Sequence, residues 1–262
     1  MRIAALPWPR PVSTRAVSTR AVPTRAVPLG LALVAVLVLG GAPAGAAYQA
    51  SVYSNKTAFT SCNGTWSTIP SSLRALAADG FAYLGYAPST FEGAAFTKSR
   101  VLSRVGLDQG FYVHSHGDHY SVGWGFREDN GTCTQGVVSA AEIAARRTKA
   151  ANLVIASTCH LAEAASNFPD AFGIERLKSK PNGTGYRGPE FFMGYVGTAW
   201  TVDMLAFETN FWAKVKSGRN LGDAFVEARA MTAWRYATVP DWYGTYSYSG
   251  SPSPVSPCPS CL

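Results

Sequence analysis

Two short apolar runs, each leading into a reactive side chain, constrain the fold of this chain more than any other feature. Residues 110–114 (Gly-Phe-Tyr-Val-His) are typical of a buried strand and lead into Ser115-His116-Gly117. Leu153–Ala156 are typical of a second strand, which leads into Cys159. A helix is expected between them, over residues 139–150. Strands that alternate with helices predict a mostly parallel sheet with helices on both faces, a three-layer α/β sandwich.

Further elements are expected on either side of these two runs. The expected helices cover Leu73–Ala78, Phe96–Val105, Leu161–Ser166, Thr201–Lys216 and a last stretch that starts at Asn220. The other expected strands are Phe81–Tyr86 and Phe191–Val196, and the glycine-rich residues 120–136 are expected to form a loop. Aromatic residues without a helical period, between Trp234 and Tyr248, either pack back on the sheet, which is the preferred interpretation, or line a substrate groove.

The first 46 residues are typical of a secretory signal peptide. Five arginines and no acid precede an apolar run of eleven residues, Leu29–Leu39, and Ala44-Gly45-Ala46 provides a small-residue cleavage site. A bilayer-spanning helix needs about 20 apolar residues, so this run is too short for a retained anchor. We therefore predict a secreted, extracellular protein that has no membrane partner once the leader is removed near Ala46.

The charge balance argues against a nucleic-acid partner. The chain has 262 residues and a formal net charge of +7, and the five arginines of the leader leave only +2 for the rest. A basic patch is the usual electrostatic signature of nucleic-acid binding. We expect one α/β domain over residues 47–248, followed by a flexible tail rich in Ser and Pro over residues 249–262.

Five cysteines in an exported chain permit disulfides. Because the number is odd, at least one thiol is free or paired between molecules. Cys62 and Cys133 lie beside Gly-Thr turns, and Cys258 and Cys261 lie in the tail. Pairs Cys62–Cys133 and Cys258–Cys261 are the preferred interpretation, although four cysteines allow three connectivities. Cys159 follows an apolar strand and is the odd one out in this scheme.

The positions of His116 and Cys159 suggest nucleophilic catalysis. Both follow the C-terminal ends of expected parallel strands, where open α/β sheets place their sites. A thiol is mostly protonated at neutral pH and needs a nearby imidazole to become a nucleophile. We interpret Cys159 as the nucleophile and His116 as its general base, with the backbone N–H groups of Gly117 and Cys159 as oxyanion donors. This chemistry requires no cofactor, and His114 is expected to be structural.

The same residues resemble a known family. Ser115-His116-Gly117-Asp118 resembles the His motif of caspase-type peptidases, and Ala156-Ser-Thr-Cys159-His160 resembles their Cys segment. Downstream, residues 191–196, 216–218 and 220–224 resemble the strand–helix–helix ending of gingipain-like domains. The resemblance covers about residues 80–235. It implies a caspase-like fold and a Cys-His hydrolase that acts on peptide or protein substrates.

Two other functions remain open at this level. The stretch His114-Ser-His116-Gly-Asp118-His119 matches the His-x-His-x-Asp-His motif of metallo-β-lactamase-like hydrolases, which bind zinc. However, only His160 remains as a further histidine, so at most a mononuclear site of His114, His116 and His119 is expected. The other possibility is a caspase-fold binding module without catalysis, in which Cys159 is buried and inert or paired with Cys133.

Overall fold

The computed structural model describes residues 48–55, 68–118, 124–128, 136–174, 189–234 and 237–252. These residues belong to one compact unit. The expected signal peptide lies outside them, as do His119 and four of the cysteines, Cys62, Cys133, Cys258 and Cys261. Of the expected tail, only residues 249–252 are described.

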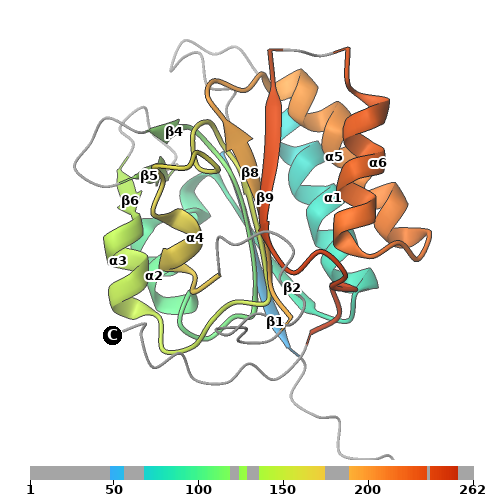
Figure 1. The fold of residues 1–262 in the computed structure, drawn as a ribbon. Helices are drawn as coiled ribbons and strands as arrows, with labels where there is room; N and C mark the ends of the chain where they lie inside the picture. Colours follow the sequence, from blue (N-terminus) through green and yellow to red (C-terminus); the bar gives the residue numbers. More distant parts are fainter. Residues whose placement is uncertain are drawn as a thin grey trace, which may run out of the picture. The chain divides into compact units, whose positions relative to one another are not determined.

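A six-stranded sheet forms the centre of this unit (Figure 1). Its spatial order is β2-β1-β3-β7-β8-β9, and all neighbours are parallel except β8 and β9, which are antiparallel. The strands are β1 (Gln49–Ser54), β2 (Ala87–Glu92), β3 (Gly110–His114), β7 (Leu153–Ser157), β8 (Phe191–Val196) and β9 (Val239–Gly244).

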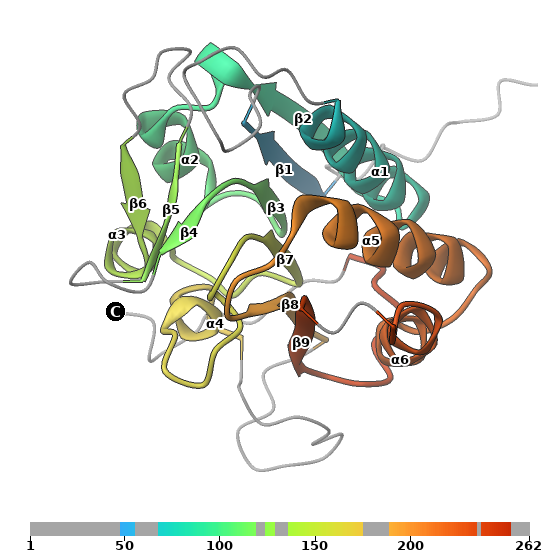
Figure 2. The same ribbon diagram turned by 90° about the horizontal axis from the view of Figure 1, so that it is seen from above.

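Helices cover both faces of the sheet, so the predicted three-layer sandwich is confirmed (Figures 1 and 2). One layer contains α1 (Ile69–Tyr83), α5 (Thr201–Lys216) and α6 (Leu221–Met231). The other contains α2 (Lys98–Arg104), α3 (Ala140–Arg146) and α4 (Phe168–Ala171). A short 3-10 helix, η1 (Gly93–Ala95), follows β2, and a small antiparallel sheet is formed by β4 (Gly117–Asp118), β5 (Gly125–Arg127) and β6 (Val137–Ser139).

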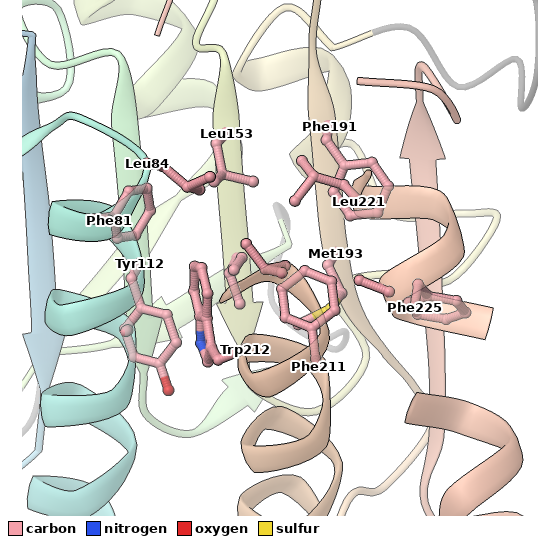
Figure 3. Close-up of a cluster of buried hydrophobic side chains, with 14 of the residues drawn as sticks. Phe81, Leu84, Tyr112, Leu153, Phe191, Met193, Phe211, Trp212, Leu221 and Phe225 are labelled. Carbon is pink, nitrogen blue, oxygen red and sulfur yellow. The ribbon is translucent and has the colours of Figure 1, made fainter. Parts of the chain in front are cut away.

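Each helical layer packs on its own apolar core. On the α5 side, Tyr112 of β3 and Met193 of β8 face Trp212 and Phe211 of α5 (Figure 3). On the other side, Phe111 and its neighbours pack against α2, α3 and α4. Because the central strands are buried on both faces, their sequences are nearly continuous apolar runs rather than alternating ones.

The start of the first helical layer differs from the expectation. The helix expected over 73–78 is confirmed but is too short, and the strand expected over 81–86 is wrong, because α1 (Ile69–Tyr83) continues without a break to Tyr83. Gly80 does not end the helix. A Cβ atom there would lie 2.2 Å from Cε3 of Trp212, so glycine allows α5 to approach α1 closely.

The segment after Cys159 also differs. Residues 161–166 form turns instead of the expected helix, and α4 begins only at Phe168. The backbone N–H groups of His160 and Ala162 donate to carbonyls of the β8 segment, Gly197 at 3.0 Å and Tyr195 at 3.1 Å. These bonds tie the backbone of residues 160–162 to the β8 segment.

Most of the remaining expectations are confirmed, but six of the described strands were not expected, namely β1, β2, β4, β5, β6 and β9. The strands at 110–114 and 191–196 and the helix at 201–216 have the expected bounds, and Ser139 and Glu142 form a capping box at the start of α3. The loop expected over 120–136 contains β5, and the aromatic segment after Trp234 packs back on the sheet as β9. Among the described helices, none is both long and apolar enough to cross a membrane.

Candidate active site

The candidate site lies where β3 and β7 end side by side. The two strands are parallel neighbours, with His114 opposite Ser157. His116 and Cys159 therefore each lie two residues beyond a paired position. The loops touch at Gly117, where a Cβ atom would lie 2.0 Å from the carbonyl oxygen of Cys159. Only glycine lets the two backbones come this close.

The backbone around His116 is held by hydrogen bonds to its carbonyl. That oxygen accepts from the backbone N–H of Arg127 in β5 at 3.0 Å and from Oγ of Ser115 at 2.9 Å. With the Arg127 bond in place, Gly117 and Phe126 form a non-hydrogen-bonded pair of the antiparallel ladder. The N–H of Gly117 consequently points away from β5.

Cys159 is a free, half-buried thiol. The backbone N–H of Ala199, in the loop after β8, donates to its Sγ with an N–S distance of 3.4 Å, and the carbonyl oxygen of Ala199 lies 3.7 Å from the same sulfur. The next residue, His160, has a φ of +65°, the only positive value at a non-glycine position among the described residues. Such backbone strain is found preferentially at functional sites.

Glu163 holds this strained segment in place and was missed by the sequence reasoning. Its Oε1 lies 2.5 Å from Nδ1 of His160 and accepts the backbone N–H of Gly197 at 3.0 Å. The His160 N–H in turn donates to the Gly197 carbonyl. The loop that carries Cys159 is thereby fixed to the loop after β8. An acid three residues after His160 was the available signal.

His114 is structural, as expected. It is fully buried, and burial lowers its pKa to about 3, so the imidazole is neutral. Nδ1 lies 3.0 Å from the carbonyl oxygen of Ser157 and 3.0 Å from its Oγ. A carbonyl only accepts, so Nδ1 carries the proton.

The zinc interpretation is not favoured by this arrangement. His114, one of its three expected ligands, binds the Ser157 carbonyl in the core. Within the part of the chain that the structure describes, no group of three or more His, Cys, Asp and Glu side chains is placed to hold a metal ion. His119 lies outside that part.

A buried carboxylate lies beneath the site on the α5 side, and it too was missed. Glu208 of α5 accepts hydrogen bonds from three strands, namely from Tyr112 in β3 at 2.9 Å, Ser157 in β7 at 2.5 Å and Tyr195 in β8 at 3.0 Å. Burial raises the pKa of Glu208 to about 7, and the three donors lower it in part.

Two exposed apolar side chains follow Ala199, the residue that contacts the thiol, along the chain. Trp200 and Val202 follow the residue that contacts the sulfur, and they are 60% and 55% exposed. The backbone N–H of Trp200 donates to Oγ1 of Thr238 at 3.0 Å, and that hydroxyl donates to the carboxylate of Asp203 at 3.0 Å. Asp203 itself is buried, so these residues present uncharged side chains to solvent.

The architecture of this unit is that of the caspase-like α/β fold. The structure is similar to that of the Arg-specific cysteine proteinase gingipain R, with a TM-score of 0.51 and 12% sequence identity over 77% of this chain and 47% of that chain. The chain thus spans about half the length of that proteinase. A structural-genomics protein from Geobacter sulfurreducens aligns with a TM-score of 0.43 and 14% identity, over 79% of this chain and 95% of that one.

Sequence comparisons do not narrow the class further. No protein-family profile matches the chain, and no curated protein sequence matches it. The likeness to gingipain R therefore establishes the caspase-like fold that the short motifs had suggested, and it shows the fold alone.

Proposed function

We propose that this protein is a cysteine peptidase in which Cys159 is the nucleophile and His116 the general base. The observation that supports it most strongly is the contact of the two strand-end loops, where Gly117 lies against the backbone of Cys159. The free thiol and the imidazole thus belong to loops that meet at one edge of a caspase-like sheet, where open α/β folds carry their sites.

The proposed reaction proceeds in two stages. His116 takes the proton of the Cys159 thiol, and the thiolate attacks the carbonyl carbon of a peptide bond. The N–H groups of Gly117 and Cys159 donate to the oxygen that becomes negative in the tetrahedral intermediate. Protonated His116 then gives its proton to the leaving amine. Water, activated by the same imidazole, hydrolyses the resulting thioester and restores the thiol.

The substrate class follows from the fold and from the surface next to the thiol. A peptidase-like fold suggests a peptide or protein substrate. Trp200 and Val202 expose apolar area within a few residues of the sulfur contact. Burying apolar surface is favourable by about 25 cal/mol for each Å². Substrate residues near the cleaved bond are therefore expected to be uncharged and apolar.

Digestion of a peptide library tests the activity. Wild type is expected to cleave a mixture of peptides from a digested proteome, with apolar residues enriched next to the cleaved bond. Cys159→Ala, which removes the sulfur and little else, is expected to cleave nothing above background. Equal cleavage by both proteins would show that Cys159 is not the nucleophile. No cleavage by either protein under reducing conditions would instead favour a caspase-fold binding module.

We also propose that the protein is exported, because residues 1–46 have the composition of a signal peptide. The mass of the chain recovered from the medium of a secreting host is expected to correspond to a start near residue 47. A mass that retains the leader would contradict export by cleavage.

A further inference from the structure

Glu208 connects the three strands whose ends form the candidate site. Two of the residues that contact it directly, Ser157 and Tyr195, each lie two positions before a residue at the site, Cys159 and Gly197. Only one residue separates each of these side chains from the site, so a shift of the backbone at Ser157 or Tyr195 is passed directly to Cys159 or Gly197.

Strand β3 joins the same network through two side chains, Tyr112 and His114. Tyr112 of β3 donates to Glu208 at 2.9 Å, and His114, two residues further, lies 3.0 Å from Oγ of Ser157. His114 is in turn two residues before His116. All the groups of this network are fully buried, so it is shielded from water.

We infer that Glu208 is a positioning residue, which sets the relative placement of Cys159 and His116 by accepting hydrogen bonds from β3, β7 and β8 at once. It acts through Ser157, Tyr112 and Tyr195, the side chains that it binds. One carboxylate has lone pairs for all three hydroxyls, whereas an apolar side chain would leave three buried donors unsatisfied.

The chemistry of the donors predicts how substitutions behave. In Glu208→Gln, the amide oxygen accepts from Ser157 and Tyr195, and the amide N–H donates to the Tyr112 oxygen. This variant keeps the connection between the strands. Glu208→Leu has a similar volume but accepts nothing, so the three strand ends lose their common partner.

The inference rests on the proposed function, because it concerns activation of Cys159 by His116. The test follows alkylation of Cys159 by iodoacetamide, with the modified peptide quantified by mass, as a function of pH. In wild type the rate is expected to rise with an inflection well below that of a free thiol, whose pKa is about 8.5. In Glu208→Leu the inflection is expected to move up by about one pH unit or more, while Glu208→Gln keeps most of the wild-type value.

A matched control separates positioning from loss of stability. Phe211 lies one turn along α5 and packs on Phe191 in the core, apart from the network. Phe211→Leu is expected to lower the melting temperature without moving the inflection. An unchanged inflection in Glu208→Leu, with His116 still required in wild type, would overturn the inference alone. A wild-type inflection that does not depend on His116 would overturn the proposed function and the inference together.

Discussion

Gly117 is the residue on which the contact between the two strand-end loops depends. A methyl group there would meet a backbone carbonyl, which cannot rotate away as a flexible side chain does. Gly117→Ala is therefore expected to lower the free energy of unfolding by about 2–3 kcal/mol, in the range of overpacked cores, and to slow alkylation of Cys159. Urea denaturation measures the first effect.

Gly218 offers the matched control for this substitution. It has a φ of +88°, and no described atom lies within 4 Å of the position that a Cβ atom would take, so alanine there is strained but unobstructed. Gly218→Ala is expected to cost about 1 kcal/mol. If Gly117→Ala costs no more than Gly218→Ala, the two loops do not depend on a glycine contact.

Two buried titratable residues below the site have opposite effects on stability. Burial lowers the pKa of His114 from 6.5 to about 3, so unfolding takes up a proton and stability falls as the pH drops below 6.5. Burial raises the pKa of Glu208 from 4.5 to about 7, so the folded state holds the extra proton and stability rises as the pH drops from 7 to 4.5. Between pH 6.5 and 4.5 the two contributions oppose each other.

Glu208→Gln removes the contribution of Glu208 to the pH dependence of stability and leaves that of His114. From pH 6.5 to 4.5, the variant is expected to lose about 2–3 kcal/mol of stability relative to wild type. The groups that face Glu208 are the hydroxyls of Tyr112, Tyr195 and Ser157, and the tyrosines stay neutral in this range because burial raises their pKa. Chemical denaturation of both proteins at several pH values checks the prediction. Parallel curves would show that Glu208 does not titrate in this window.

Residue identity in the site was only partly predictable from the sequence. The strand pattern and the spacing to Cys159 pointed to His116 and Gly117, and His114 was correctly expected to be structural. Glu208 was missed, although it falls on the apolar stripe of α5, four residues after Met204 and four before Trp212. An acid at a core position signals a buried partner, but the three donors on separate strands are visible only in the fold.

At the scale of elements, the close approach of α1 and α5 depends on Gly80. A Cβ atom on Gly80 would overlap the indole ring of Trp212, which is fully buried in the core. Gly80→Ala is expected to cost about 1–3 kcal/mol despite the higher helix propensity of alanine. Thermal or urea unfolding measures this loss.

A double-mutant cycle tests whether overlap with the Trp212 ring causes the loss of stability in Gly80→Ala. Trp212→Leu is itself destabilising because it leaves a cavity, but it opens space for the alanine methyl group. The double variant is expected to be more stable than the sum of the single effects by at least about 1 kcal/mol. Additive effects would mean that the indole ring does not obstruct position 80.

The element boundaries show which local signals are dependable. Apolar runs such as Phe191–Val196 gave correct strands, and the capping pattern of Ser139 gave a correct helix start. The Asp79-Gly80 pair is a common stop signal, but the contact with α5 overrides it. In β1, polar residues interrupt the apolar run that would have predicted a strand. The buried Ser51 hydroxyl donates to Asp108 and accepts from Arg104, and these contacts join distant segments.

At the scale of the whole described unit, the alternation of strands and helices was sufficient to predict the architecture. Consecutive parallel strands are usually neighbours in such a sheet, and β3 and β7 follow this rule, so their ends lie side by side. The order of the strands and the antiparallel edge strand β9 depend on long-range pairing, which short-range patterns do not encode.

The proposed activity of the whole molecule depends on Cys159 being a nucleophile that His116 activates. The most direct measurement is the rate of iodoacetamide labelling of Cys159 at pH 7 in wild type and in His116→Ala, with His114→Asn as a control on the structural histidine. We expect fast labelling in wild type and roughly a tenfold slower rate in His116→Ala, with Cys159 still reached by the reagent in the control. Equal rates in wild type and His116→Ala would contradict the proposed Cys-His pair.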